Sequence, residues 1–116
     1  MVRTEMRVDQ SRRRRQRQII NEIAGFDFAL PGSVEFRRTR CGQPGCRCHA
    51  EPPALHGPYI VWTRKVAGKT VSRTLTNEQL TAYQPWLDNA RRLRHLVSEL
   101  HDLTLEIVEE HHRSLH

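Results

Sequence analysis

The sequence predicts an α+β protein in which a small three-stranded antiparallel sheet is preceded by one helix and followed by a longer one. The periodicity of apolar residues in three successive segments supports this prediction. Ile19, Ile20 and Ile23 have the spacing of one helical face, as expected for a helix near the N-terminus. Within residues 33–75, three short segments alternate with a period of two around a Gly- and Pro-rich loop at 41–57, and a helical period returns after residue 85. We divide the chain into a basic helical arm at 1–30, a loop and sheet module at 31–76, and a kinked C-terminal helix at 77–116.

The first helix has recognisable start and stop signals. Residues 3–24 contain no glycine or proline, Asp9 or Ser11 can cap the start, and Gly25 can close the end. Arg12–Arg15 would then lie in the first turn, where the positive end of the helix dipole disfavours cations. We therefore expect either an anionic partner for these arginines or an earlier start of the helix.

Alternation of apolar and polar residues predicts the sheet. Val34 and Phe36 fall on one face of the first strand, while Glu35 and Arg37 fall on a basic outer face. The dipeptide Ala67-Gly68 is a turn signal that joins the next two strands into a hairpin. The predicted strands cover residues 33–40, 58–66 and 69–75.

The C-terminal helix begins with a capping box. The Thr76 hydroxyl can accept from the Gln79 amide while the Gln79 side chain reaches back to Thr76. Because proline lacks an amide proton and clashes with the preceding turn, we expect a short helix to about Tyr83, a kink, and a long helix from Pro85 to about His111.

Apolar residues recur along that helix with alternating spacings of four and three, which is typical of coiled-coil packing. The stripe either packs within one chain or joins two copies. A helix of about 27 residues is about 40 Å long, which exceeds what a sheet of this size covers. This length favours a homodimer formed through the stripe, with Leu93, Val97, Leu100 and Ile107 as the contact residues.

Three cysteines lie within eight residues, which is too few and too close together for the disulfide framework of a secreted protein. Zn²⁺ prefers four tetrahedral thiolate and imidazole ligands. The predicted structural zinc ligands are Cys41, Cys46, Cys48 and His56. His49 is the alternative fourth ligand; we prefer His56 because the side chains of adjacent residues such as Cys48 and His49 tend to diverge. Free or redox-active thiols, and an open three-thiolate catalytic zinc, are the competing interpretations.

Charge is unevenly distributed along the chain, whose formal net charge is +6. Residues 1–75 hold 15 Lys and Arg against six acids, whereas residues 76–116 hold four Arg against seven acids. Such asymmetry is typical when one part of a chain meets a polyanion and the other meets protein.

We expect nucleic-acid binding, DNA rather than RNA, with a solvated charged tail as the alternative. The expected contact residues are Arg12, Arg13, Arg14, Arg15, Arg17, Arg37, Arg38, Arg40, Arg64, Lys65, Lys69 and Arg73. Tyr59 and Trp62 are candidates for base stacking, although Trp62 is better explained as a core residue.

Several classes of function are disfavoured. No apolar run approaches the length of a membrane span, and no secretory signal follows the arginine-rich start, so we expect a cytoplasmic protein that is nucleoid-associated if it binds DNA. No Ser/His/Asp or paired-carboxylate constellation points to an enzyme. The sequence favours a zinc-stabilised nucleic-acid-binding accessory protein; the alternative is a protein–protein adaptor that assembles through its C-terminal helix.

Three sequence elements carry a resemblance to a known family. They are CGQPGCRC at 41–48, HGPY at 56–59 and GKT at 68–70, followed by the long helix. The chain resembles, from about Leu30 to Leu105, a family of short prokaryotic proteins of unknown function with a CGxPxCxC, HGPY and GKT pattern. Some members of that family are encoded near transposases. The resemblance therefore implies a link to mobile elements and to a larger recombination or transposition machine, and it leaves the arginine-rich front outside the family pattern.

Overall fold

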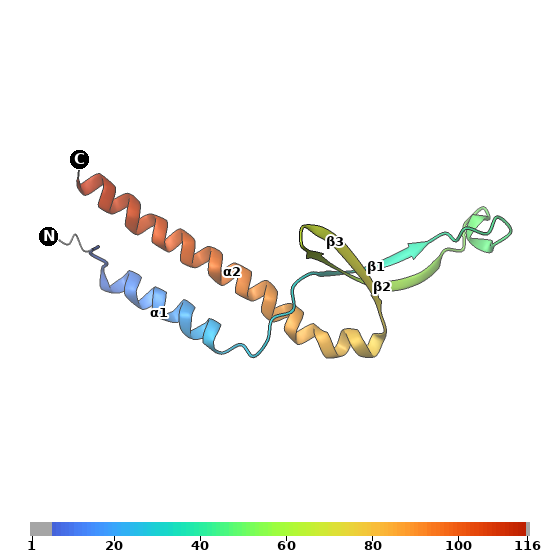
Figure 1. Cartoon of the computed structure of the whole chain (residues 1–116), viewed down its shortest axis with the longest axis horizontal. Helices are drawn as coiled ribbons and strands as arrows, with labels where there is room; N and C mark the ends of the chain where they lie inside the picture. The colour runs from blue at the N-terminus through green and yellow to red at the C-terminus, as the bar shows by residue number, and fades with distance from the viewer. Residues whose placement is uncertain (1–5, 116) are drawn as a thin grey trace. The chain divides into compact units, whose positions relative to one another are not determined.

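The computed structural model describes residues 6–115 and has the predicted α+β architecture (Figure 1). Two α-helices, one short 3₁₀ helix and three strands follow one another along the chain. In order they are α1 (Gln10–Ala24), β1 (Ser33–Thr39), η1 (Arg47–His49), β2 (His56–Val66), β3 (Lys69–Leu75) and α2 (Asn77–Ser114).

The chain forms two compact units that divide within α2. The helical unit comprises the described residues up to Ala29 together with those from Asn89 onward, and the sheet unit comprises Leu30–Asp88. The first part of α2 therefore belongs to the sheet unit, and the remainder pairs with α1.

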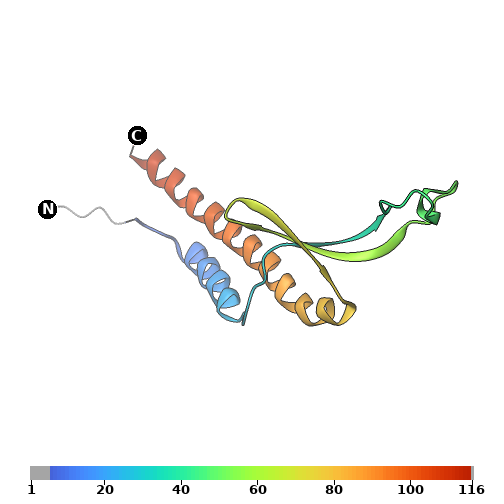
Figure 2. The ribbon, with the colours of Figure 1, turned by 45° about the vertical axis from the view of Figure 1, so that its right-hand side comes forward.

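In the helical unit, α1 lies antiparallel beside α2, as two views show (Figures 1 and 2). Ile19 of α1 and Leu96 of α2 form its centre, and each is 1% exposed. The Asp9 carboxylate caps α1 by accepting a hydrogen bond of 2.8 Å from the Arg12 amide. Acidic residues of α2 supply the anionic partner expected for the first turn, because Glu106 and Glu110 both pair with Arg12.

The sheet unit contains the antiparallel order β1-β2-β3. Ile60, Val61 and Leu75 are its buried strand residues. The turn between β2 and β3 is the predicted one, and both Ala67 and Gly68 have the positive φ that tight hairpin turns require.

The register distributes the basic residues of the sheet over both faces, contrary to the expected single basic face. Trp62 pairs with Arg73, and Arg64 lies two residues along the same strand as Trp62, so all three share one face. Arg37 pairs with Tyr59, and both fall on the opposite face. A period of two necessarily separates neighbours such as Arg64 and Lys65, so strand formation itself prevents a continuous basic surface.

Helix α2 begins with the predicted capping box. Thr76 and Gln79 exchange hydrogen bonds of 2.9 and 3.0 Å. The predicted break at Tyr83 is absent, because α2 continues through Pro85 as one helix. Proline removes only one backbone hydrogen bond, and the burial of Leu87 and Ala90 directly after it favours continuation. None of the helices in the described part of the chain has the length and apolar character needed to cross a bilayer.

Candidate metal centre

The candidate metal centre lies in the loop that joins β1 to β2, drawn in green at the far end of those strands (Figure 1). Backbone hydrogen bonds between residues close in sequence fold this polar segment. The Cys46 amide donates to the Gln43 carbonyl, and the His49 amide donates to the Cys46 carbonyl at 3.0 Å. The β1–β2 register pairs Thr39 with His56, which brings the start of β2 back beside the cysteines.

The four predicted ligands form one cluster. Ligand atoms of Cys41, Cys46, Cys48 and His56 all lie within 4.8 Å of one another. The sulfurs of Cys41 and Cys48 are 3.6 Å apart, and the sulfur of Cys46 is 3.2 Å from Nε2 of His56. For comparison, bond lengths of about 2.3 Å to sulfur and 2.0 Å to nitrogen give tetrahedral edges of about 3.8 and 3.5 Å. The cluster can therefore hold a metal ion after only small side-chain movements.

Hydrogen bonds around the sulfurs favour thiolate at this site. The Cys41 amide donates to the Cys48 sulfur at 3.3 Å, a contact that neutralises charge on a metal-bound thiolate. Hydrogen bonds from the backbone and side chain of Cys48, followed by those from Cys41 and His56, lower the pKa of Cys46 to about 6. Burial raises the pKa of Cys48, so that this sulfur becomes a thiolate most readily when a cation is bound.

His49 lies outside the cluster. Its Nε2 is 2.8 Å from the Cys41 carbonyl oxygen, and the side chain is exposed. This contact gives His49 a role in holding the loop, whereas His56 contributes the fourth ligand atom of the cluster. Four protein ligands leave no coordination position for water, which is the arrangement of a structural site.

The predicted nucleic-acid residues of α1 divide into two groups. Arg12 pairs with Glu106 and Glu110, and Arg15 pairs with Glu99, so both have partners within the chain. By contrast, three arginines are exposed and form no ion pair within residues 6–115. They are Arg13, Arg14 and Arg17.

The predicted residues of the sheet unit also have different surroundings. Arg64 stacks over the Trp62 ring with its guanidinium carbon 4.2 Å from the ring centroid, and Arg37 pairs with Glu35. Lys65 donates to the Thr70 hydroxyl at 2.6 Å. Lys69 and Arg73 are exposed on β3. Arg38 and Arg40 are exposed where β1 enters the metal loop, and Arg47, next to Cys46 in the sequence, is also exposed.

The predicted contact stripe of α2 is partly used inside the helical unit. Leu93, Leu100 and Ile107 are half-buried, and Val97 is 37% exposed. The central residue is Leu96, which the alternating stripe placed at its border. The position of α1 explains the difference, because α1 covers one side of the stripe and leaves the other side open.

The comparisons with known proteins give one match. The family model described as "Domain of unknown function (DUF6788)" matches residues 9–85. This range includes the arginine run of α1, which the sequence resemblance had left outside, and it ends within α2. No curated protein and no solved structure matches the chain.

Proposed function

The chain belongs to the DUF6788 family of domains of unknown function, and on that premise we propose that it is a nucleic-acid-binding accessory protein whose sheet unit is stabilised by structural zinc. The metal cluster and the basic residues around it support the proposal. Both lie in the sheet unit, Leu30–Asp88, and the matched range covers that unit up to residue 85.

Zinc is the metal that suits the donors best. Three soft thiolates and one imidazole in a compact tetrahedral set are typical of structural zinc, whereas magnesium and calcium prefer oxygen ligands. The loop at 41–55 is mostly polar and contains little regular structure beyond η1. In such a segment, the free energy of metal binding contributes directly to folding.

The observation that carries nucleic-acid binding is the set of exposed cations bordering the metal loop. Arg38, Arg40 and Arg47 are exposed, and Glu51 is the only acid between residues 41 and 55. Arginine binds phosphate oxygens through a planar, multidentate guanidinium. Tyr59, near the start of β2, is 41% exposed and is the register partner of Arg37, and its ring offers a surface on which a base can stack.

The exposed arginines of α1 form a second group of exposed cations, in the helical unit. Arg13, Arg14 and Arg17 have no acid partner within the described residues, whereas Arg12 and Arg15 bind acids of α2. The proposed phosphate contacts on α1 are therefore the three exposed arginines and exclude the two that hold the helices together.

Titration with labelled DNA duplexes at several salt concentrations tests the proposal. Neutralising three phosphates gives a slope of about −2.7 in log K against log salt. The variant Arg38→Gln/Arg40→Gln/Arg47→Gln is expected to lose most of the affinity and flatten the slope. A matched control, Arg91→Gln/Arg94→Gln/Arg113→Gln, removes the same charge from exposed positions of α2. Absence of binding by the metal-loaded protein at low salt, or equal losses in both variants, contradicts the proposal.

A further inference from the structure

One edge of the helical unit is closed by ion pairs. Glu22 of α1 receives two hydrogen bonds from Arg92 of α2, and Arg15 of α1 pairs with Glu99 of α2. Further along, Arg12 pairs with Glu110. Residue numbers rise along α1 as they fall along α2, so the helices are antiparallel, and the Glu22–Arg92 and Arg15–Glu99 pairs mark a single edge.

The opposite edge is open and apolar. Taking Ile19 as the centre of the α1 face, Arg15 and Glu22 lie about 40–60° around the helix in one direction and Ile20 about 100° in the other. With Leu96 as the centre of the α2 face, Arg92 and Glu99 lie about 40–60° around the helix on the ion-pair side, and Val97 lies about 100° in the other direction. When two antiparallel helices face each other, equal rotations from their two facing residues, in the same sense along each sequence, point to the same edge of the pair. Ile20 and Val97 therefore border one groove between α1 and α2.

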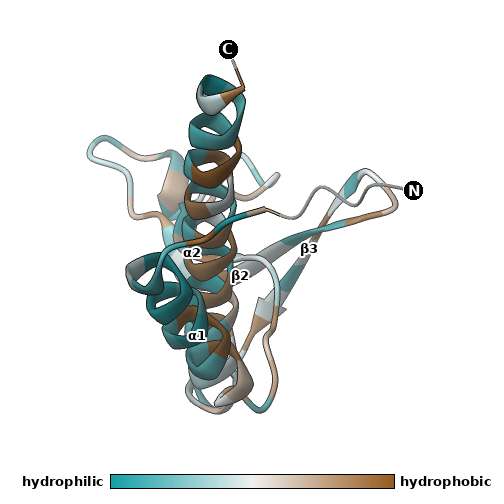
Figure 3. Ribbon diagram, turned by 90° about the vertical axis from the view of Figure 1, so that its left-hand side faces the viewer, coloured by the Kyte–Doolittle hydropathy of each residue, from teal (hydrophilic) through white to brown (hydrophobic). Residues whose placement is uncertain are grey.

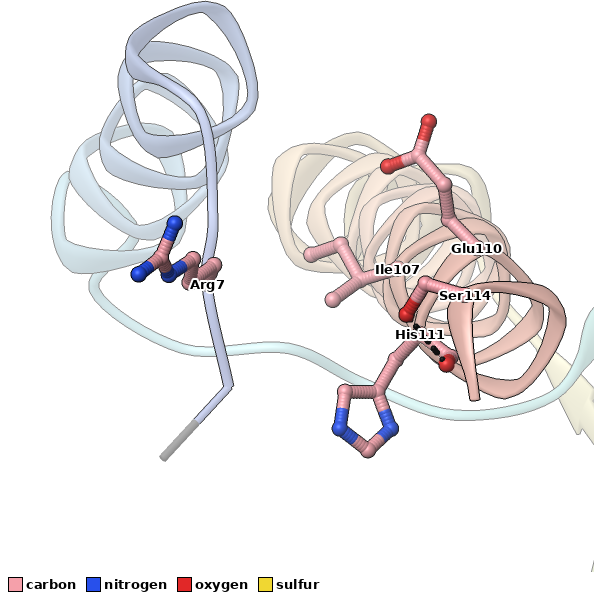
Figure 4. A pocket seen from close by; sticks show the side chains of 5 residues that line it. All are labelled: Arg7, Ile107, Glu110, His111 and Ser114. Carbon is pink, nitrogen blue, oxygen red and sulfur yellow. Dashed lines mark hydrogen bonds between the residues drawn. The ribbon is translucent and has the colours of Figure 1, made fainter. Parts of the chain in front are cut away.

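The open groove, defined by Ile20, Val97, Ile107 and Val108, exposes much of its apolar surface. Ile20 is 41%, Val97 37% and Val108 45% exposed. Hydrophobic segments, brown in Figure 3, recur along α2 beyond the part that α1 covers. Towards the C-terminal end of α2, a cavity of about 480 Å³ has Ile107 in its wall (Figure 4).

Among the residues that the structure describes, two arginines border the groove, against one acid. Arg7 lines the cavity with His111, and Arg13 lies about 120° from Ile19, on the groove side. Glu110 also lines the cavity, but its carboxylate pairs with Arg12. Glu22 and Glu99, which form ion pairs between the two helices, lie at the other edge.

We propose that this groove binds an acidic amphipathic helix of a partner protein, which would complete a three-helix bundle. Two helices alone leave part of each apolar face exposed, and a third helix laid in the groove buries it. Carboxylates on the flanks of that helix pair with Arg7 and Arg13. A second copy of this chain fits less well, because its own groove would bring cations against cations. Nucleic acid also fits less well, because a charged phosphate backbone would not bury the apolar side chains of the groove.

The dimensions define the ligand. Val97 to Val108 spans about 16 Å along α2, or about three helical turns. The partner helix therefore presents apolar residues at positions i, i+3 or i+4, and i+7 over three turns, with Glu or Asp on both flanks.

A fluorescently labelled synthetic helix of this design is the probe, and a second peptide with the same apolar positions and lysine in place of glutamate is its control. Binding to the full chain is measured by anisotropy. The acidic peptide is expected to bind at least about tenfold more tightly than the lysine peptide. Equal affinity for the two peptides, or no binding of the acidic one, would overturn the proposal.

Matched variants locate the site. Val97→Asp/Val108→Asp is expected to abolish acidic-peptide binding, whereas Val66→Asp, at an equally exposed valine of the hairpin, leaves it unchanged. Arg7→Gln/Arg13→Gln is expected to weaken binding, whereas Arg14→Gln/Arg91→Gln, at exposed arginines about 140° from Ile19 and from Leu96 on the ion-pair side, has little effect. Circular dichroism checks that each variant remains folded. Peptide binding that survives Val97→Asp/Val108→Asp contradicts the assignment, as does sedimentation showing a dimer that this double variant dissociates. The proposed function at the metal loop is tested separately by Arg38→Gln/Arg40→Gln/Arg47→Gln, because that variant changes no residue of the groove.

Discussion

The sulfur of Cys46 lies 3.2 Å from Nε2 of His56, although ten residues separate them in the chain. The contact arises from strand pairing, since Thr39 of β1 is the register partner of His56 of β2. A hairpin thus closes the loop, and the metal cluster forms where its strands meet.

Replacing His56 is expected to impair metal binding, whereas replacing His49 is not. His56→Ala removes one of four ligand atoms, while His49→Ala removes only the contact to the Cys41 carbonyl. Metal content of purified variants, measured by plasma emission spectrometry, checks this. We expect one ion per chain in the His49 variant and substoichiometric, easily chelated metal in the His56 variant. Equal metal content in both variants would show that His56 is not a ligand.

Gly32→Ala is expected to destabilise the sheet unit. Gly32 has a φ of +116°, and a Cβ there would lie 2.5 Å from Nε1 of Trp62 and 2.6 Å from the Thr63 carbonyl oxygen. The indole N–H donates to the Pro31 carbonyl at 3.0 Å, so the ring cannot move freely. A loss of more than about 1 kcal/mol in the free energy of unfolding is expected from urea titration. Gly45→Ala is the control, because no atom lies within 4 Å of its Cβ.

Leu96→Ala tests the centre of the helical unit. Leu96 is 1% exposed, whereas Leu105 on the same helix is 59% exposed. Removing the buried side chain leaves a cavity and is expected to cost about 2–5 kcal/mol in unfolding free energy. Leu105→Ala is expected to change it by less than about 0.5 kcal/mol. Similar costs for the two substitutions would mean that α1 does not cover Leu96.

The Glu22–Arg92 pair gives the helical unit a pH dependence. Hydrogen bonds from Arg92 lower the pKa of Glu22 below its ordinary value of about 4.5. A carboxyl whose pKa is lower in the folded state stabilises the fold above its unfolded pKa and loses that contribution as the pH falls through the folded value. Urea midpoints of the wild type and Glu22→Gln are therefore expected to differ at pH 7 and to converge towards pH 3.

The control for this prediction is Glu109→Gln. Glu109 is exposed and forms no ion pair in the part of the chain that the structure describes. Its replacement is expected to leave the pH dependence unchanged. A Glu22→Gln difference that stays constant from pH 7 to pH 3 would argue against the ion pair in solution.

Local signals predicted most of the elements. The Thr76–Gln79 capping box and the Ala67-Gly68 turn occur as expected, because each depends on residues that are neighbours in sequence. The helix interruption expected between Tyr83 and Pro85 was wrong, since propensity does not register the burial of Leu87 just beyond it. The four ligands of the cluster were also identifiable, because zinc chemistry restricts both residue type and number.

The surfaces were less predictable. Nothing local shows that Arg12 and Arg15 pair with acids more than eighty residues away, so the arginine run was interpreted as uniformly available for phosphate. The open groove likewise depends on where α1 lies against α2. Composition indicates that charge and apolar residues are present, but tertiary packing decides which of them remain exposed.

X-ray absorption spectroscopy of the protein purified with zinc tests the metal cluster most directly. The structure predicts one ion per chain, with three sulfur ligands at about 2.3 Å and one imidazole nitrogen at about 2.0 Å. A protein that holds no stoichiometric metal, or a zinc shell dominated by oxygen, would contradict it.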